Sequence, residues 1–174
     1  MALAAPASAH TPGTAIGQAV LALGEVPVSY TNGAVVSELE ADAFGRLPGV
    51  GEDIYVAALP ASVLREQPGG PSAVAGEIAR EAILHGTVVV VAGTKLGAWS
   101  DQIPENRLER LVRIAASGRG DPATRAGALV LAVDAEPTSS GGGRLWLVAA
   151  PSALLVAALA FAAYVLLRRR AARA

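Results

Sequence analysis

One stretch constrains this chain more than any other: positions 145–167 read LWLVAAPSALLVAALAFAAYVLL, 23 residues without a charge. At about 1.5 Å per residue, a helix of that length reaches about 34 Å, and the hydrocarbon core of a bilayer is roughly 30 Å thick. A helix buried in a protein core is the alternative, but such apolar runs are usually shorter. The stretch therefore predicts one transmembrane helix, with the lipid bilayer as its partner.

The flanks of this stretch are typical of a membrane anchor. Trp146 and Tyr164 lie near its two ends, where aromatic rings prefer the lipid headgroup region. A basic tail at 168–174 follows and begins with Arg168, Arg169 and Arg170. Only Arg144 stands just before the stretch, so the positive-inside rule predicts a single-pass protein of the cell membrane. Its C-terminus should be cytoplasmic and its domain should lie outside the cytoplasm.

Translocation of the domain normally requires an export signal, and the beginning of the sequence offers only part of one. Ala7-Ser8-Ala9 resembles a signal cleavage site, but neither a basic region nor an apolar region of adequate length precedes it. Two alternatives remain: the sequence starts after a signal peptide, or the helix inserts as a tail anchor and leaves the domain inside. We expect the outside orientation. Residues 1–12 are predicted to be disordered.

Charge and composition exclude several classes of function. All 15 acidic residues lie before Gly141, so the domain is mildly acidic and lacks the basic face that binding to nucleic acid requires. The chain has no cysteine, which excludes disulfides, thiolate metal sites and a cysteine nucleophile. A row of small residues at Ala149, Ala153 and Ala157 would allow a homo-oligomer, although alanine is common enough here to produce the row by chance.

The apolar pattern between these ends alternates between helix and strand. Helices are predicted over five stretches, which start near Gly13, Ser37, Ser72, Pro104 and Asp121. VPVSYTNG is predicted to be extended, and DIYVAAL and TVVVVAG are predicted strands buried on both faces, with the valine run central. Residues 95–101 should add an edge or hairpin strand. We therefore expect one α/β domain at 13–136, a three-layer sandwich around a small, partly parallel sheet, and a flexible linker at 137–144.

Two stretches of this domain resemble a known family. The TPM domain opens with an extended V-x-D-x-A-G-x-L-S, a glutamate-rich helix and a valine-rich strand, and this chain is similar in VSYTNGAVVSELEADAFGRLPGVGEDIYVAALPAS. The family's second central strand is similar to HGTVVVVAGTKLGAWS. A group of actinobacterial single-pass membrane proteins with a degenerate TPM-like domain looks closer still, in VVVVAGTKLGAWSDQIPENRLERL and the anchor. The resemblance covers residues 15–167 and implies a TPM-like fold and anchoring.

The resemblance also implies a candidate activity. Some TPM domains have been proposed as acid phosphatases or divalent-metal binders, with acidic residues on loops at one end of the sheet. In this chain the aspartate of V-x-D is replaced around Ser29, Tyr30 and Thr31. We therefore transfer the fold and the anchor, and keep a TPM-type metal-dependent phosphatase as the alternative function.

The residues themselves offer few candidates for chemistry. Glu38 and Asp42 lie four apart on one predicted helix face and could share a hard cation, but calcium prefers six or more oxygens, so a solvated face is the simpler interpretation. Ser100 and Asp101 resemble a turn and a helix entry, and the sequence places no histidine to activate the serine. GVGED at Gly49 precedes a strand and lacks a third glycine, so it is interpreted as a turn and not as a phosphate loop.

Neither histidine is typical of a catalytic base. His10 lies in the predicted disordered start. His85 is expected at the end of a helix through Leu84, where it would continue the inward face of Ile78 and Ala82 or meet the final carbonyls. On another helix, a row of arginines could meet an anionic partner, although Glu109 beside it suggests an ordinary mixed-charge surface; the row is Arg107, Arg110 and Arg113.

These patterns predict no catalytic, cofactor-binding or metal-binding residue, and the anchor residues named above are the predicted functional set. The expected function is a membrane-anchored, non-enzymatic interaction or regulatory module with an unidentified protein partner. The actinobacterial proteins that the chain resembles are often encoded near cell-wall hydrolases, which implies a role in bacterial cell-envelope or division-related assembly.

Overall fold

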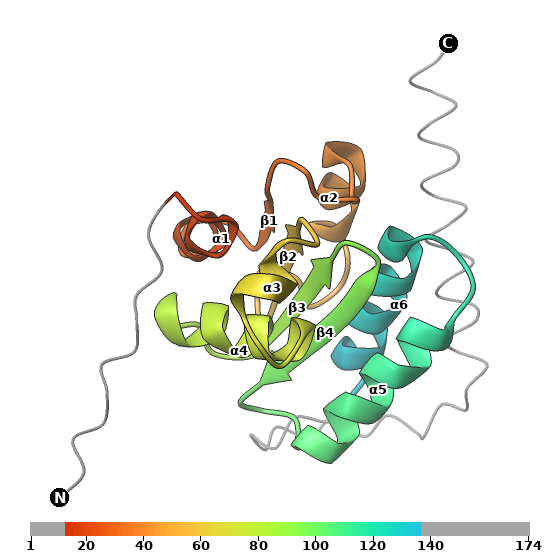
Figure 1. The fold of residues 1–174 in the computed structure, drawn as a ribbon. Helices are drawn as coiled ribbons and strands as arrows, with labels where there is room; N and C mark the ends of the chain where they lie inside the picture. The colour runs from red at the N-terminus through yellow and green to blue at the C-terminus, as the bar shows by residue number, and fades with distance from the viewer. Residues whose placement is uncertain (1–12, 137–174) are drawn as a thin grey trace, which may run out of the picture.

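The structure is a computed structural model that describes residues 13–136. Its centre is a four-stranded sheet in the order β1-β2-β3-β4 (Figure 1). The first three strands are parallel and the fourth is antiparallel to the third. The prediction of a small, partly parallel sheet is therefore confirmed, with β1 at Val28–Tyr30, β2 at Ile54–Leu59, β3 at Thr87–Ala92 and β4 at Lys95–Ser100.

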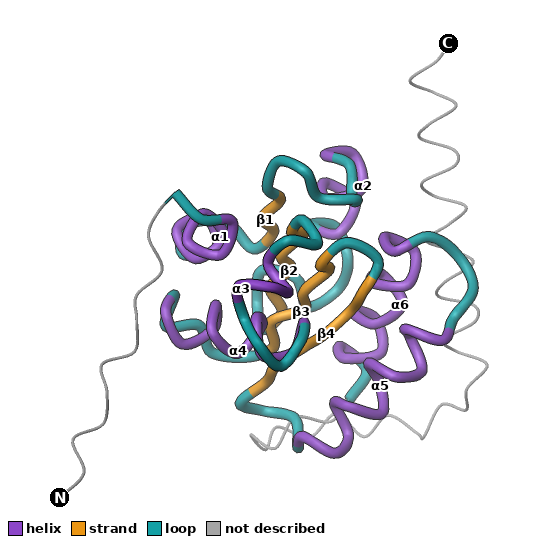
Figure 2. Tube along the Cα trace, in the orientation of Figure 1, coloured by secondary structure: helices purple, strands orange, loops and turns teal. Residues whose placement is uncertain are grey.

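Helices cover both faces of this sheet, which gives three layers (Figure 2). One face carries α1 at Ala15–Leu23, α3 at Val63–Glu66 and α4 at Pro71–Glu81. The other face carries α2 at Glu38–Phe44, α5 at Glu105–Ser117 and α6 at Pro122–Asp134. The predictions of disorder at 1–12, a linker at 137–144, a transmembrane helix at 145–167 and a basic tail at 168–174 fall outside the described residues.

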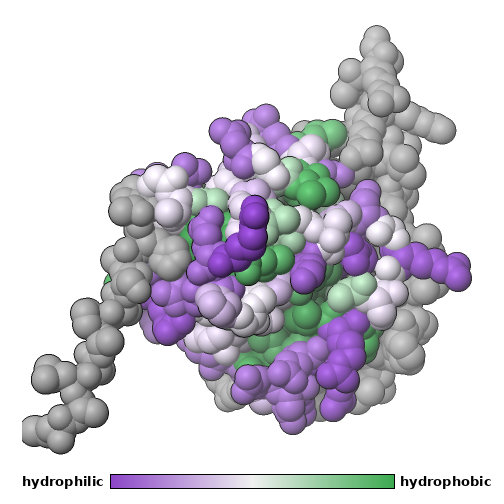
Figure 3. All heavy atoms as spheres, viewed as in Figure 1, coloured by the Kyte–Doolittle hydropathy of each residue, from purple (hydrophilic) through white to green (hydrophobic). Residues whose placement is uncertain are grey.

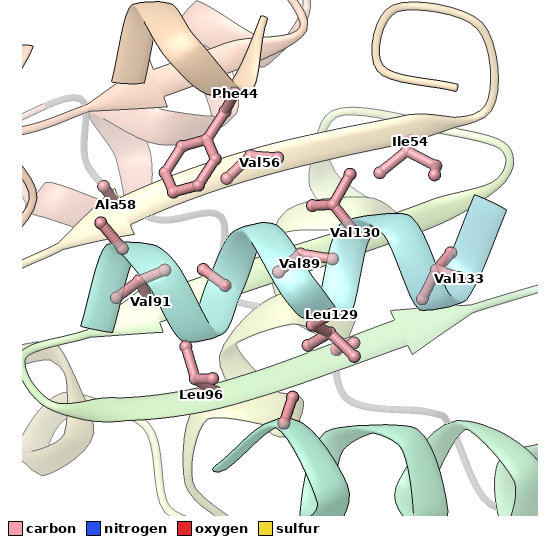
Figure 4. Close-up of a cluster of buried hydrophobic side chains, with 14 of the residues drawn as sticks. Phe44, Ile54, Val56, Ala58, Val89, Val91, Leu96, Leu129, Val130 and Val133 are labelled. Carbon is pink, nitrogen blue, oxygen red and sulfur yellow. The ribbon is translucent and has the colours of Figure 1, made fainter. Parts of the chain in front are cut away.

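The two middle strands are apolar on both sides because each side meets a different core. Val56 and Val89 face one core, which Figure 4 shows between the sheet and the side chains of Phe44, Leu129 and Val130. The alternate residues of the same strands belong to the other core, which α1, α3 and α4 complete; they are Ala57, Leu59, Val88 and Val90. All six residues of β3 are buried. The valine run is thus interior to the sheet, as predicted.

Several helix starts match their predicted signals. Ser37 and Glu40 form the predicted capping box, in which the Glu40 carboxylate accepts from the Ser37 N–H over 2.8 Å. Asp121 caps α6 by accepting from the Thr124 N–H over 2.7 Å, with Pro122 in the first turn. These caps are local in sequence, which is why sequence alone was enough to find them.

The helix predicted to run from Ser72 to about Leu84 is wrong at both ends. It begins at Pro71 after Gly70, and the Ser72 hydroxyl accepts from the Ala98 N–H of β4 instead of capping its own helix. It ends at Glu81, because Ile83 takes a positive φ of 54° and the Leu84 N–H turns back to the Ala79 carbonyl. That 6→1 bond is the signature of a Schellman stop, three residues before the predicted stop at Gly86.

Candidate functional site

The carboxyl ends of the three parallel strands meet at one edge of the sheet, where open α/β sheets usually bind ligands. The loops that leave these strands contact one another through small residues. A Cβ atom at Gly33 would lie 3.6 Å from the Cβ of Pro60, and one at Gly93 would lie 2.8 Å from the Cβ of Ala61. The loops therefore pack closely on each other at the edge where a ligand would be sought first.

The acidic pair considered for a cation lies beside this edge, next to β1. Glu38 and Asp42 are exposed on α2, and the phenol of Tyr30 donates a hydrogen bond to Glu38. Desolvation, the charge of Glu38 and its hydrogen bond raise the pKa of Tyr30, and the charge of Asp42 adds to this. Among residues 13–136, no group of three or more His, Cys, Asp or Glu side chains could hold a metal ion. Tyr30 is one neighbour of this pair.

At the opposite end of the strands, where β3 begins and β4 ends, lies a pair of side chains that the sequence did not indicate. Nδ1 of His85 lies 3.1 Å from Oδ2 of Asp101, and the Gly86 N–H donates to Oδ1 over 2.8 Å. The His85 side chain is 85% exposed, so the expectation that it continues an inward helix face is wrong. The expectation that it meets the final helix carbonyls fails as well, because α4 ends four residues earlier and the intervening turn carries His85 toward β4.

The bonds to Asp101 decide its ionisation. Desolvation alone acts to raise the pKa of Asp101, but the hydrogen bonds from Gly86 and His85 and the charge of His85 act against it and leave that pKa lowered. Asp101 is therefore held as a carboxylate, with one oxygen on a backbone amide and the other on an imidazole. This arrangement fastens the turn before β3 to the end of β4.

Ser100, next to Asp101, stabilises the turn that leads into α5, as predicted. The Ser100 hydroxyl oxygen accepts from the Gln102 and Ile103 N–H groups, each over 3.1 Å. It also accepts from the Thr87 hydroxyl over 2.9 Å, which joins the end of β4 to the start of β3. A serine oxygen with these contacts holds the entry to α5.

Basic side chains on the described part of the chain also have structural contacts. Nη1 of Arg107 lies 3.6 Å from the Glu136 carboxylate, and the arginine row predicted on α5 is exposed. Sequence reasoning missed Arg125, which donates to the Thr94 and Ala116 carbonyls over 3.0 Å each. It thereby ties the first turns of α6 to the β3–β4 hairpin and the end of α5. Its position near the positive end of a helix, where arginine is unfavourable, was the available signal.

The predicted anchor lies outside the described part of the chain, and so do its residues Trp146, Tyr164, Arg168, Arg169 and Arg170. No helix within residues 13–136 is both long enough and apolar enough to cross a bilayer.

Comparison with known proteins gives no relative from which a role could be transferred. No family model, curated protein or solved structure matches this chain. The TPM-like fold therefore stays a prediction from residue patterns, while the mixed α/β sandwich around a four-stranded sheet is observed.

Proposed function

We propose that this chain is a membrane-anchored, non-enzymatic interaction or regulatory module that acts in bacterial cell-envelope or division-related assembly. The anchor is supported by the uncharged stretch at 145–167 and by the arginines after it, which also favour a domain outside the cytoplasm. A TPM-like domain is supported by the order of a glutamate-rich helix, a buried strand and a valine-rich strand within the sandwich.

The observation that carries the interaction role is a concentration of exposed apolar side chains. Of the six large hydrophobic residues that are exposed in the described part of the chain, four lie between positions 21 and 35; they are Leu21, Val26, Tyr30 and Val35. These positions run from α1 past β1 to the loop before α2. Figure 3 shows one face of the molecule, on which hydrophobic residues lie in several places among hydrophilic ones. Exposed apolar side chains concentrated along one segment favour an interaction site on that segment.

Membrane attachment is tested by fractionation of cells that express the full chain. The intact chain should stay with the membranes after alkaline extraction, and the double substitution Leu155→Arg with Ala158→Arg should release it, because each charge at a bilayer centre costs about 3 kcal/mol. Leu155→Val with Ala158→Val is the matched control and should remain in the membrane. An intact chain found in the aqueous fraction would contradict the anchor, and a reporter at position 140 active only in the cytoplasm would contradict the outside orientation.

The interaction role is tested by photo-crosslinking in cells. A photoreactive amino acid at Val35 should give one discrete adduct with a protein, whereas the same group at exposed Arg113 on α5 should not. Equal adducts from both positions would contradict a specific surface.

The alternative activity is measured in the same preparation: hydrolysis of a phosphate monoester that is lost on chelation and in Glu38→Gln with Asp42→Asn would establish the phosphatase instead.

A further inference from the structure

Along β1, at one edge of the sheet, residues 13–136 place no neighbouring strand on the outer side. The register pairs Val28 with Val56 and Tyr30 with Ala58. The Pro27 carbonyl accepts from the Val56 N–H over 2.9 Å, and the Thr31 N–H donates to the Ala58 carbonyl over 3.0 Å. In a parallel pair, bonding alternates along the strand, so the N–H and C=O groups of Val28 and Tyr30 point away from β2. No described strand lies on that side. Four backbone groups therefore face outward along β1.

The other edge of the sheet is covered. The Ser72 hydroxyl of α4 accepts from the Ala98 N–H of β4 over 3.3 Å. The same helix lies so near that a Cβ atom at Gly97 would be 2.3 Å from the Ser72 nitrogen. Covering an edge with a helix is a common protection against unwanted strand pairing. Within the described part of the chain β4 has that protection and β1 does not, which distinguishes β1 as the edge at which a further strand can pair.

Exposed apolar side chains follow the open edge. Tyr30 is 45% exposed and Val26 is 48% exposed, and Val35 in the loop after β1 is 54% exposed. Figure 1 shows β1 between α1 and α2, so an added strand would have a helix on each side. Backbone groups with apolar side chains beside them are the two elements that recognition by strand addition uses.

Acidic side chains lie at both ends of this edge, and Arg46, just after α2, is the first basic residue of the chain. No lysine or arginine occurs before Arg46, whereas this part of the sequence carries Glu25, Glu38, Glu40 and Asp42. Glu40 is buried in the cap of α2, but the other three are exposed, with Glu25 before the strand and Glu38 and Asp42 beside its last residue. An incoming segment with positive side chains would meet opposite charge at both ends of the strand.

We propose that the β1 edge binds an extended, basic segment of a partner protein as a fifth strand of the sheet. This inference rests on the proposed interaction function and adds its mode and the chemistry of the partner. A second copy of the chain fits less well, because antiparallel pairing of two β1 edges would place Glu25 of one copy near the acidic start of α2 of the other.

The experiment uses the full chain in lipid nanodiscs and an array of peptides of about ten residues, in which Lys or Arg alternates with Val, Ile, Thr or Tyr. Members of this array should bind, and a matched array with Glu in place of each basic residue should not. Binding should weaken with salt and in Glu38→Gln with Asp42→Asn, while Glu109→Gln on α5 serves as the control. If no basic peptide binds, or if the acidic array binds equally, the proposal is overturned.

A second comparison measures what an outward backbone N–H group of β1 contributes to peptide binding. Tyr30→Pro removes one outward N–H group but leaves the neighbours that bond to β2, and Tyr30→Val loses the same ring and keeps the N–H group. The proline variant should bind the selected peptide about tenfold more weakly than the valine variant, which corresponds to one lost hydrogen bond with its steric conflict. The Thr31 amide, bonded to β2, reports whether the sheet is intact in both variants.

Amide hydrogen exchange in the unmodified chain also tests whether the peptide pairs with the backbone of β1. The amides of Val28 and Tyr30 should exchange fast in the free protein and slowly with peptide bound, whereas the Thr31 amide should be protected in both states. Equal binding by the proline and valine variants, or unchanged exchange at Val28 and Tyr30, would refute strand addition. The proposed function would survive that outcome if the crosslink at Val35 still formed, so the two failures are distinguishable.

Discussion

Ile83 is the clearest case of a single residue at odds with its surroundings. It takes a φ of 54°, the only positive φ of a residue other than glycine among those described, and 80% of it is exposed. A left-handed conformation costs an ordinary residue about 1–2 kcal/mol, and so little buried surface does not offset that cost. The position is one where glycine is normally found, after the last turn of a helix.

Ile83→Gly should therefore stabilise the domain. The expected gain in the free energy of unfolding is about 1 kcal/mol, after subtraction of the extra backbone freedom that glycine has in the unfolded chain. Urea unfolding of the full chain measures it. Ile83→Ala is the control and should gain less, because its Cβ atom retains the conflict with the backbone. A loss of stability in the glycine variant would show that the isoleucine side chain makes a contact worth more than the strain.

Asp101 provides a prediction about pH. Its pKa is lowered from the ordinary 3.8 in the folded state, so the folded state binds its proton more weakly than the unfolded state does. The resulting stabilisation is present above the ordinary pKa and is lost as the pH falls through the lowered pKa. The free energy of unfolding of the wild type should exceed that of Asp101→Asn by about 1 kcal/mol at about pH 5, and this difference should shrink at about pH 3.

The variant His85→Ala distinguishes the contributions of the two hydrogen bonds to Asp101. This variant keeps the bond from the Gly86 N–H and should lose only part of the stabilisation at the higher pH. A difference between wild type and Asp101→Asn that does not change with pH would mean that the carboxylate charge contributes nothing to folding. The pairing itself was not predictable, because 16 residues separate His85 and Asp101 and only the β3–β4 hairpin brings them together.

At the scale of elements, the contact between α4 and β4 depends on the absence of a side chain. A Cβ atom at Gly97 would lie 2.3 Å from the Ser72 nitrogen and 2.6 Å from the Cβ of Pro71. Both are parts of the helix start, which cannot move without breaking the bond from the Ala98 N–H to the Ser72 hydroxyl. The helix thus lies on the strand backbone itself at this point.

Gly97→Ala should destabilise the domain by about 3 kcal/mol, the upper end of the usual cost of overpacking. Thermal unfolding monitored by circular dichroism measures the loss. Gly45→Ala is a matched control, since its φ is −60° and the nearest atom to an added Cβ is 3.6 Å away, and it should be nearly neutral. If the two variants unfolded at the same temperature, α4 would have to shift on β4 at little cost.

Elements with local signals were predictable, and those set by contacts were not. The capping box at Ser37 and the cap at Asp121 depend on residues three positions apart. Ser72 looked like a cap of the same kind, yet its hydroxyl bonds to β4, 26 residues away. A serine before an apolar run can serve either purpose, and only the position of the neighbouring strand decides between them.

At the scale of the molecule, one sheet serves two cores and has two unlike edges. The valines of β3 divide between the cores by strict alternation, which explains why the run has no polar position. At the edges, α4 covers β4, whereas β1 is flanked by helices and no other described strand lies on its outer side. The proposed partner strand belongs to this scale, because it depends on which edge the helices leave open.

The sequence by itself determined the alternation of helices and strands, the burial of the valine run and the local caps, because periodicity and capping act between near neighbours. It also provides the whole basis of the predicted anchor, since the length and charge of a single run are sequence properties. Only the tertiary structure decided that His85 pairs with Asp101, that Tyr30 bonds Glu38, and that β1 is the open edge. Those outcomes depend on which segments pack side by side, and distance along the chain does not contain that information.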